Sequence, residues 1–568
     1  MADSKPRIAV FAGPTATIMN SAPLVTSNQA RRRHGIPLLT DEWGAPLAQD
    51  VLRPQRIAAP VTIYVEQFSA HPLEREAANL YGPPDGFLDR SGTFHQERTG
   101  PDDVPVYEVV LRPEDGLVPL PYMARQADGS AWDDDTARRG ASPAESRQPF
   151  YPDGSRIFEE IDRLGLDEDG VGNLMARHAD YDFYRVIPSG GYPTGRAERD
   201  RTDVGEGDIQ PEEMFRDFFP YRPYHLRKEP PRSLVARLTN RVQAALGSGA
   251  YQGGLWLEGS PTTEETTYWL NLLIDTTVPV IGCQSPDYPH GMVGASGDRH
   301  LIDAVRYIAS GIWKDESGRD RVGAVLISAE QLFLAREVQK ADARPGGYVA
   351  TGGHGGIVGT TGEPGPPILT YVPVWRHTWR SDVRVTVLPE IVRGTQGSGT
   401  GARTVDVRVK DESGALRGEA IPNVDFHKHA RYLRESTADT PEEEEGLLAR
   451  IERNLRHHPL AGFVVEGTTP YGNANSTTDA ALQRATFLGM PVVRVGRGDT
   501  GGFVAPERVR LGIAGANLTA TKARLLLMAC LLRFGALPPA ADADRPTTAE
   551  IAATEEAIAQ YQAVFESH

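Results

Sequence analysis

Three hydroxyl and amine side chains stand where ordered elements are predicted to end. Thr15 follows the apolar run Arg7 to Ala12, within the turn GPTAT. Ser260 follows the apolar run GLWL, within EGSPTTEET, and Lys340 ends the segment AREVQK. A serine or threonine hydroxyl is a weak nucleophile until a base takes its proton, and a partly desolvated lysine can be that base. These residues therefore indicate acyl-transfer chemistry by a hydroxyl and a lysine.

Each of the three residues also has a purely structural interpretation. Thr15 could serve only as a turn hydroxyl. Ser260 could cap a helix, because Pro261 suits the first helical position. Lys340 could be a solvated lysine that the dipole at a helix C-terminus favours. Ligands bind beyond the carboxyl ends of the strands in an open parallel sheet, so the joint placement of the three residues favours the catalytic interpretation.

Alternating strands and helices supply the elements that would position these residues. Short apolar runs predict strands, and apolar residues at helical spacing predict helices. In the N-terminal part we predict strands at 7–12, 254–257, 279–282 and 323–327 and helices at 233–246, 263–273, 300–312 and 331–340. Such alternation, with near-continuous apolar strands, indicates a parallel sheet covered by helices on both faces.

A second alternating unit occupies the C-terminal part. We predict strands at 462–465 and 491–495 and helices at 442–456, 476–488, 517–533 and 548–566. Asn517 is expected to cap the third of these helices, and Gly535 is expected to end it. The predicted fold class is therefore α/β, with two α/β domains and mostly parallel sheets.

Changes in composition divide the chain further. A chain of 568 residues exceeds what one hydrophobic core usually organises. We expect an N-terminal α/β domain at 1–375, a connector at 376–422 and a C-terminal α/β domain at 423–568. Within the first, the segment 80–231 is dense in charged residues, Gly, Pro and Tyr and lacks sustained periodicity. Its aromatic side chains argue against full disorder, so we interpret it as an irregular, ordered insertion.

Composition and charge exclude several classes of function. The chain carries 60 Lys and Arg against 76 Asp and Glu, and this net charge of −16 argues against a nucleic-acid partner bound through its phosphates. No run approaches the roughly 18 apolar residues of a membrane span. The first residues, MADSKPRIAVFAG, lack the longer apolar region of a secretory signal. We therefore expect a cytoplasmic protein with no nucleic-acid or membrane partner.

Cysteine, glycine and histidine patterns give no support for a cofactor. The two cysteines, Cys283 and Cys530, cannot build a disulfide framework or a metal site and are interpreted as buried thiols. The glycines at 352–356 lack the following helix that a phosphate-binding loop needs. His427 and His429 share a strand face, but only one carboxylate is near them in sequence. We expect no cofactor and no metal.

The order of the motifs resembles that of the bacterial asparaginase/glutaminase amidohydrolases. AGPTAT looks like the first turn of that family and places Thr15 at the position of its threonine nucleophile. EGSPTTEETTYWLNLL is similar to the second motif, with Ser260 for the second catalytic threonine, and AREVQK supplies Lys340. GASGDRHLIDAVRYIA, GFVVEGTTPYGNAN and LTATKARLLLMACLL also resemble family segments. The resemblance covers about 1–70 and 232–568.

This resemblance implies an enzyme that hydrolyses carbon–nitrogen amide bonds. Thr15 or Ser260 would attack an amide carbonyl, Lys340 would handle the proton, and backbone N–H groups near Gly13 or Gly259 would stabilise the oxyanion. A neighbouring subunit completes the site in that family, so a homodimer or homotetramer is implied. The residues expected to bind a small-molecule amide substrate are Glu66, Gln67, Pro261, Thr262, Ser296, Asn473 and Asn475.

The chain departs from the family where the family holds its amino-acid substrate. Pro261 replaces the acidic residue that binds the substrate ammonium, and a proline offers neither charge nor N–H. The lid tyrosine has no evident equivalent, and the nearest residues to the carboxylate-binding Ser-Gln pair are Glu66 and Gln67. An unpaired ammonium is costly to desolvate. We therefore expect a modified or cyclic amide, such as an imide, lactam or ureide, in place of free L-asparagine.

Other functions stay open at this point. A non-catalytic binding or regulatory paralogue would explain Pro261 and the missing tyrosine, whereas the presence of Lys340 argues against it. A true L-asparaginase/glutaminase is a second alternative. An ammonia-delivering subunit of a tRNA amidotransferase is disfavoured, because the extra segment is internal and the net charge is acidic.

Overall fold

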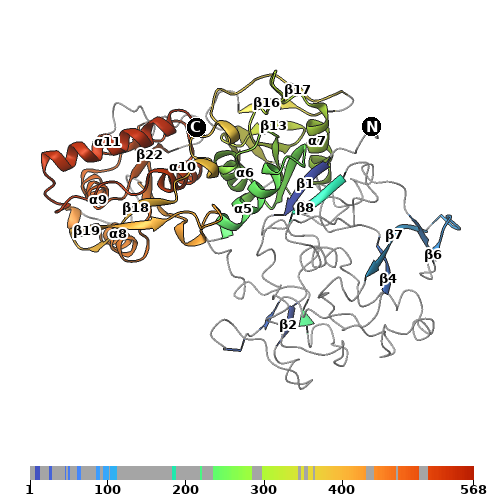
Figure 1. Cartoon of the computed structure of the whole chain (residues 1–568), viewed down its shortest axis with the longest axis horizontal. Coiled ribbons are helices and arrows are strands. Elements are labelled where there is room, and N and C mark those ends of the chain that lie inside the picture. The colour runs from blue at the N-terminus through green and yellow to red at the C-terminus, as the bar shows by residue number, and fades with distance from the viewer. Residues whose placement is uncertain are drawn as a thin grey trace. The chain divides into compact units, whose positions relative to one another are not determined.

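The structure is a computed structural model of the whole chain (Figure 1). The residues that it describes are 7–12, 25–27, 45–46, 49–50, 61–65, 85–89, 94–101, 103–111, 182–186, 218–219, 234–284, 297–342, 347–350, 356–362, 365–429, 440–468, 471–497 and 510–568. Most of the predicted insertion at 80–231 lies outside these ranges.

Contacts divide the chain into two compact units, which we call the first unit and the second unit. The first unit comprises 1–230, 250–260 and 283–305, and the second comprises 231–249, 261–282 and 306–568. The division into an N-terminal domain, a connector and a C-terminal domain stays a prediction.

Three parallel strands organise the first unit. Strand β1 (Arg7–Ala12) pairs with β10 (Gly253–Glu258) on one side and with β8 (Asp182–Val186) on the other, parallel to both. The rings of Phe11 and Trp256 stack with their centroids 6.4 Å apart, and both side chains are almost completely buried. Burial on both faces explains why these strands read as continuous apolar runs in the sequence.

Two smaller antiparallel sheets also belong to the first unit. One has the order β3-β2-β9, and the other has the order β4-β7-β5-β6. Their bounds are β2 (Val25–Ser27), β3 (Gln49–Asp50), β4 (Val61–Val65), β5 (Gly86–Leu88), β6 (Phe94–His95), β7 (Val104–Leu111) and β9 (Phe218–Phe219).

Helices α5 (Leu234–Gly247) and α6 (Thr262–Leu273), strand β11 (Val280–Gln284) and helix α7 (Gly297–Ser310) agree with the elements expected from the sequence. Helix α6 packs closely on β11. A Cβ atom at Gly282 would come within 2.1 Å of the Thr267 hydroxyl oxygen, so only glycine allows this approach.

The predicted helix at 331–340 is wrong, because the segment forms two strands. Strand β12 (Val325–Ser328) turns directly into the antiparallel β13 (Gln331–Leu334), and β14 (Val338–Lys340) pairs with β15 (Tyr348–Ala350). Ala329 and Glu330 form the two-residue turn with φ of 50° and 62°. Such turns normally carry Asn-Gly, so the sequence gives no turn signal here. The segment QLFLAREVQK is also rich in good helix formers, so its local preference for a helix is overridden by the burial of the strand.

Antiparallel pairing continues from this hairpin. Strand β16 (Ile357–Thr360) pairs with β13 and β17 (Ile368–Leu369). Short 3₁₀ helices η7 (Thr378–Arg380) and η8 (Val385–Val387) follow, and then the hairpin of β18 (Ile391–Ser398) and β19 (Gly401–Arg408). The last 3₁₀ turns are η9 (Gly418–Ala420) and η10 (Pro441–Glu443).

A four-stranded parallel sheet forms the C-terminal part of the second unit. Its order is β20 (Asn423–Lys428), β21 (Ala461–Gly467), β22 (Val492–Gly496) and β23 (Ile513–Ala514). Its helices are α8 (Glu445–His457), α9 (Ser476–Phe487), α10 (Ala520–Phe534) and α11 (Thr548–Phe565). The predicted α/β class is therefore confirmed, with a parallel-rich sheet and helices beside several antiparallel hairpins.

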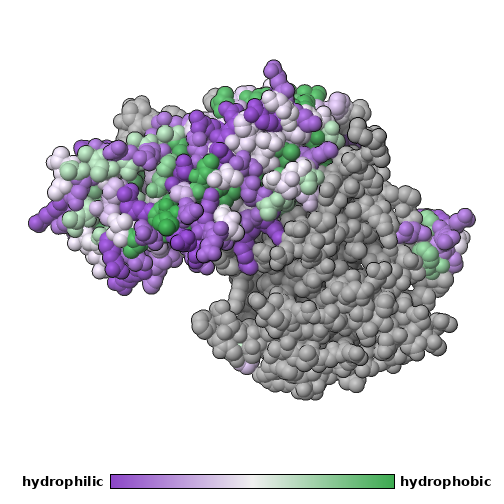
Figure 2. All heavy atoms as spheres, viewed as in Figure 1, coloured by the Kyte–Doolittle hydropathy of each residue, from purple (hydrophilic) through white to green (hydrophobic). Residues whose placement is uncertain are grey.

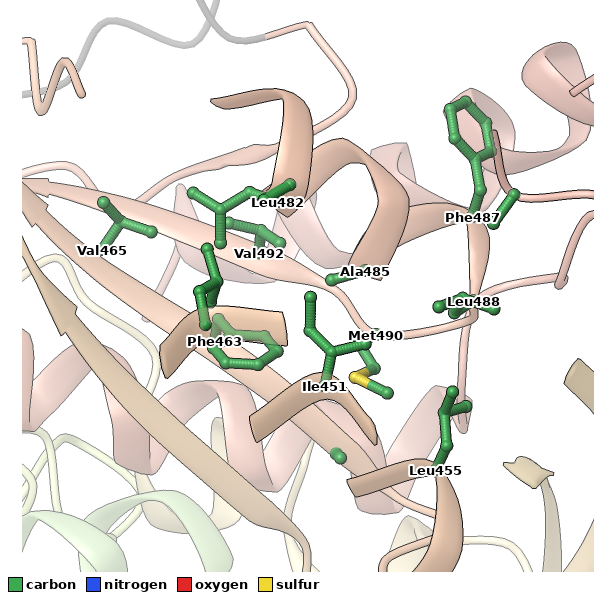
Figure 3. Packing of buried hydrophobic residues seen from close by; sticks show 14 of the residues in the cluster. Ile451, Leu455, Phe463, Val465, Leu482, Ala485, Phe487, Leu488, Met490 and Val492 are labelled. Atoms are coloured by element: carbon green, nitrogen blue, oxygen red, sulfur yellow. The ribbon is translucent and has the colours of Figure 1, made fainter. Parts of the chain in front are cut away.

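Side chains of α8, α9, β21 and β22 share one apolar cluster (Figure 3). Phe463 and Val465 of β21 are fully buried in it. Gly462, the residue before Phe463, approaches the Leu527 side chain of α10 instead. Because successive strand residues point to opposite faces, α10 covers the other face of this sheet.

The ends of α10 correct one expectation and confirm another. Thr519, not Asn517, caps the helix, since its side chain accepts a hydrogen bond from the Lys522 N–H. Gly535 ends the helix with φ of 77°, as expected. A Cβ there would lie 2.4 Å from the Arg393 carbonyl oxygen.

Among the helices that the structure describes, none is long and apolar enough to cross a membrane. Cys283 and Cys530 are free and buried, as expected. Figure 2 shows hydrophilic and hydrophobic residues interspersed on the visible described surface.

Candidate active site

Ser260 lies in the short turn that joins β10 to α6. Strand β10 ends at Glu258, and α6 begins at Thr262. Glu258 is fully buried, and its carboxylate accepts a hydrogen bond of 2.8 Å from the indole N–H of Trp256, which holds the end of the strand. Ser260 thus follows the carboxyl end of a buried strand, where open α/β sheets bind ligands.

The Ser260 hydroxyl does not cap α6. The capping position is Pro261, which has φ of −89° and ψ of 0°, and no side chain caps the helix. The Oγ atom of Ser260 is buried and has no hydrogen-bond partner among the residues that the structure describes. A buried polar atom without a partner costs about 1–3 kcal/mol, and a functional role is one reason to retain it. The interpretation of Ser260 as a helix cap is therefore wrong.

Strand register sets the carboxyl ends of β1 and β10 level with each other. Ala12, the last residue of β1, pairs with Leu257 of the parallel β10. Thr15 comes three residues after Ala12, and Ser260 comes three residues after Leu257. Thr15 itself lies outside the described residues, so its role as an alternative nucleophile stays a prediction.

Lys340 is the last residue of β14 and not the end of a helix, so a helix dipole does not explain it. Its backbone N–H donates a hydrogen bond to the carboxylate of Glu264, in the first turn of α6. Its Nζ lies 5.2 Å from the centroid of the Tyr348 ring, and the side chain is half-buried. The hydrogen bond to Glu264 thereby anchors the backbone of Lys340 to the first turn of α6.

A second lysine joins the same elements from α10. Lys522 is 1% exposed, and its Nζ donates to the carbonyl oxygens of Glu264, at 2.6 Å, and Ala335, at 2.7 Å. Three motifs that are distant in the sequence, TTEET, AREVQK and KARLLL, therefore meet through Lys522 and Glu264. We call these two residues, with the backbone of Ala335 and Lys340, the lysine hub.

Burial dominates the electrostatics of the lysine hub. Desolvation lowers the pKa of Lys522 to about 8, although the carboxylates of Glu264 and Glu265 favour its charged form. Desolvation raises the pKa of Glu264, against the attraction of Lys522 and the hydrogen bond from the Lys340 backbone. Desolvation also raises the pKa of Glu265, with Lys522 and Arg524 opposing it. In the hub, the charged forms of Lys522 and Glu264 thus stabilise each other against the cost of burial.

Asn475 and Asn473 lie in the C-terminal part of the second unit, and each takes part in a local hydrogen bond. Asn475 caps α9, because its side-chain oxygen accepts a hydrogen bond of 2.8 Å from the Thr478 N–H. Asn473 is exposed, and its carbonyl oxygen accepts a hydrogen bond of 3.0 Å from the Thr468 N–H. The structure gives each a local structural task, and their contact with a substrate stays a prediction.

The remaining predicted site residues divide into two groups. Pro261 is exposed and Thr262 is half-buried at the start of α6. The residues outside the described part of the chain are Thr15, Glu66, Gln67 and Ser296.

Sequence reasoning did not assign a role to Glu264 or Lys522. Both stand inside motifs that the sequence singles out, TTEET and KARLLL. A buried-looking lysine within the apolar run LTATKARLLLMACLL is the signal that could have identified Lys522, because lysine is almost never fully buried without a partner.

No protein-family model matches the chain. Among solved structures, the chain is similar to a crystal structure of a probable cytoplasmic L-asparaginase from Campylobacter jejuni, with 19% sequence identity and a TM-score of 0.41. The similarity covers 59% of this chain and 86% of that chain.

Proposed function

We propose that this protein is an amidohydrolase that cleaves a carbon–nitrogen amide bond with a hydroxyl nucleophile. The observation that carries the proposal is the Ser260 hydroxyl, which is buried, serves no helix cap and has no hydrogen-bond partner within the described part of the chain. It stands directly after a buried parallel strand, next to a helix start that is tied to Lys340.

The reaction that these groups would perform has two halves. In the first, the oxygen of Ser260 or Thr15 adds to the amide carbonyl while Lys340 takes the hydroxyl proton. The carbon–nitrogen bond then breaks, the proton passes to the leaving nitrogen, and an ester to the enzyme remains. In the second half, water adds to the ester and releases the acid. The backbone N–H of Gly259 is a candidate donor to the developing oxyanion.

The preferred substrate in this proposal is a modified or cyclic amide without a free α-ammonium group. Pro261, exposed at the start of α6, supplies no carboxylate to such a group. An uncompensated ammonium would cost several kcal/mol of binding free energy, whereas an imide, lactam or ureide carries no such charge.

A panel of open amides, imides, lactams, ureides and L-asparagine tests the proposal by release of amine or ring opening. We expect turnover of an uncharged amide. Among separate variants, Lys340→Met should lose most of kcat, and so should Ser260→Ala or Thr15→Ala, whichever removes the nucleophile. His457→Gln, at an exposed position at the end of α8 with no role in the proposed site, is the control. Efficient turnover of L-asparagine would contradict the substrate class, and turnover that survives all three substitutions would contradict the mechanism.

Pro261 also supports a second candidate, a binding protein that keeps the fold without catalysis. Such a protein would bind members of the panel in calorimetry without turning any of them over. Ser260→Ala would then change the binding affinity and nothing else.

A further inference from the structure

The buried Lys522 of α10 reaches two backbone carbonyl groups that belong to different parts of the candidate site. Its Nζ donates to Glu264, 258 residues away in the sequence, and to Ala335, 187 residues away. Glu264 lies in the first turn of α6, and Ala335 begins the segment that ends at Lys340. One side chain thus fixes the backbone of both.

A third contact closes the arrangement. The carboxylate of Glu264 accepts a hydrogen bond from the Lys340 N–H. Glu264 therefore accepts two hydrogen bonds: its carbonyl oxygen accepts one from the Lys522 amine, and its carboxylate accepts one from the Lys340 N–H. The Lys522 amine donates to main-chain carbonyl oxygens. A shift of this amine would therefore move the backbone at Glu264 and Ala335, and not only a side-chain rotamer.

The surroundings of Lys522 leave little room for a substitute. Its Nζ lies 5.2 Å from the centroid of the Tyr268 ring, and its side chain is 1% exposed. Tyr268 is fully buried as well. Because the amine is almost completely shielded from solvent, its removal takes one hydrogen-bond donor from each of the two carbonyl oxygens.

We propose that Lys522 is a positioning residue, which holds the segment 335–340, and with it Lys340, against the start of α6 so that Lys340 can act in the reaction. This inference rests on the proposed function. Lys522 touches neither reacting group through its own Nζ, so its effect passes through the backbone of Glu264 and Ala335.

The role does not require a permanent charge on Lys522. An ammonium has three N–H donors, and the neutral amine still has two, one for each carbonyl oxygen. Both hydrogen bonds can therefore persist on either side of the pKa near 8. The groups that face the amine are Glu264, Glu265 and the Tyr268 ring.

The test compares Lys522→Met, which removes the amine at similar length, with Lys522→Arg, which keeps donors and charge. Lys410→Met is the matched control, because Lys410 is also a buried lysine of the second unit and donates to the carbonyl oxygen of Thr386 at 3.4 Å. Two readouts are used: kcat and KM on the best substrate of the amide panel, and hydrogen–deuterium exchange of the backbone amides.

For Lys522→Met we expect kcat to fall about 100-fold with KM changed less than about 3-fold, because misplacement of reacting groups by about 1 Å costs that much. The amide of Lys340 should exchange faster, while amides of the sheet β20–β23 stay protected. Lys522→Arg should recover part of kcat, and Lys410→Met should keep wild-type kcat and wild-type exchange at Lys340.

Wild-type kcat in Lys522→Met would overturn the proposal, as would an equal loss of kcat in Lys410→Met. If Lys522→Met does not fold, the same comparison is made with Lys522→Gln, which keeps one donor group on a shorter side chain. If the wild-type protein turns over no amide, the proposed function fails, and exchange at Lys340 still reports separately whether Lys522 holds the segment. Unchanged exchange there would reject the positioning role on its own.

Discussion

Acidification should destabilise the second unit in part through the buried His377. This residue precedes η7 and is 2% exposed. Its Nδ1 lies 3.0 Å from the Thr378 hydroxyl oxygen, and its Nε2 has no hydrogen-bond partner within the described ranges. Burial lowers the pKa of His377 to about 4, with the nearby Arg380 acting in the same direction. A proton on the ring would place a charge in a largely desolvated site, and the hydrogen bond with the backbone of Arg321 offsets this cost only in part.

The direction of the effect follows from the two pKa values. In the folded protein His377 has a pKa of about 4, against 6.5 as its ordinary value. The unfolded chain therefore binds more protons between these values, so the free energy of unfolding falls as the pH drops below 6.5 and is unaffected by this residue above pH 7. At pH 5 the loss comes to about 2 kcal/mol, from the difference of about 2.5 between the pKa values.

Urea unfolding of the wild type and of His377→Gln, each at pH 7 and pH 5, measures this contribution. His377→Gln should be less stable than the wild type at pH 7 but should lose about 2 kcal/mol less on acidification. His457→Gln, at an exposed histidine at the end of α8, is the matched control and should lose as much as the wild type. If His377→Gln and the wild type lose the same free energy between pH 7 and pH 5, the reasoning about His377 is refuted.

Two further substitutions examine the described contacts. Glu264→Ala should lower the free energy of unfolding by about 1–3 kcal/mol, because the partly buried Lys340 N–H loses this acceptor. Glu264→Gln should lose less, because its amide oxygen can still accept the hydrogen bond, and equal losses in urea unfolding would contradict the hydrogen bond. Asn475→Ala should cost about 1 kcal/mol through loss of the α9 cap, with Asn473→Ala within about 0.5 kcal/mol of the wild type in the same assay. A loss of kcat in Asn475→Ala far beyond its loss of stability would instead assign Asn475 a direct role with the substrate.

The strands and helices of the α/β fold were predictable where one local pattern dominates. The buried strands around Leu255 and Val464 read as apolar runs, and a helix was expected at 548–566, where the structure has α11 with a capping box at Thr547. Prediction failed at 331–340, where helix-forming residues occupy strands and the turn at Ala329 and Glu330 lacks the usual glycine. Burial of Leu332 and Phe333 overrides the local preference there.

The candidate site was predictable only in part, because its residues come together through contacts over long sequence distances. The hydroxyl of Ser260 and the segment of Lys340 could be named from motifs. The motifs could not predict that Pro261 takes the capping position of α6, or that the Ser260 hydroxyl has no hydrogen-bond partner among the described residues. Nor does any local pattern indicate that Lys522 reaches Glu264, since 258 residues separate them.

The most direct test of the proposed function is a search for the ester between enzyme and substrate. The protein is mixed with the best amide of the panel, quenched in acid within the first turnover and examined by intact-mass and peptide mass spectrometry. We predict an acyl group on the peptide that contains Ser260 or on the peptide that contains Thr15, absent when the acylated residue is changed to alanine. Amide cleavage that proceeds at the wild-type rate in a Ser260→Ala and Thr15→Ala double variant, with no acyl group on either peptide, would contradict a hydroxyl nucleophile.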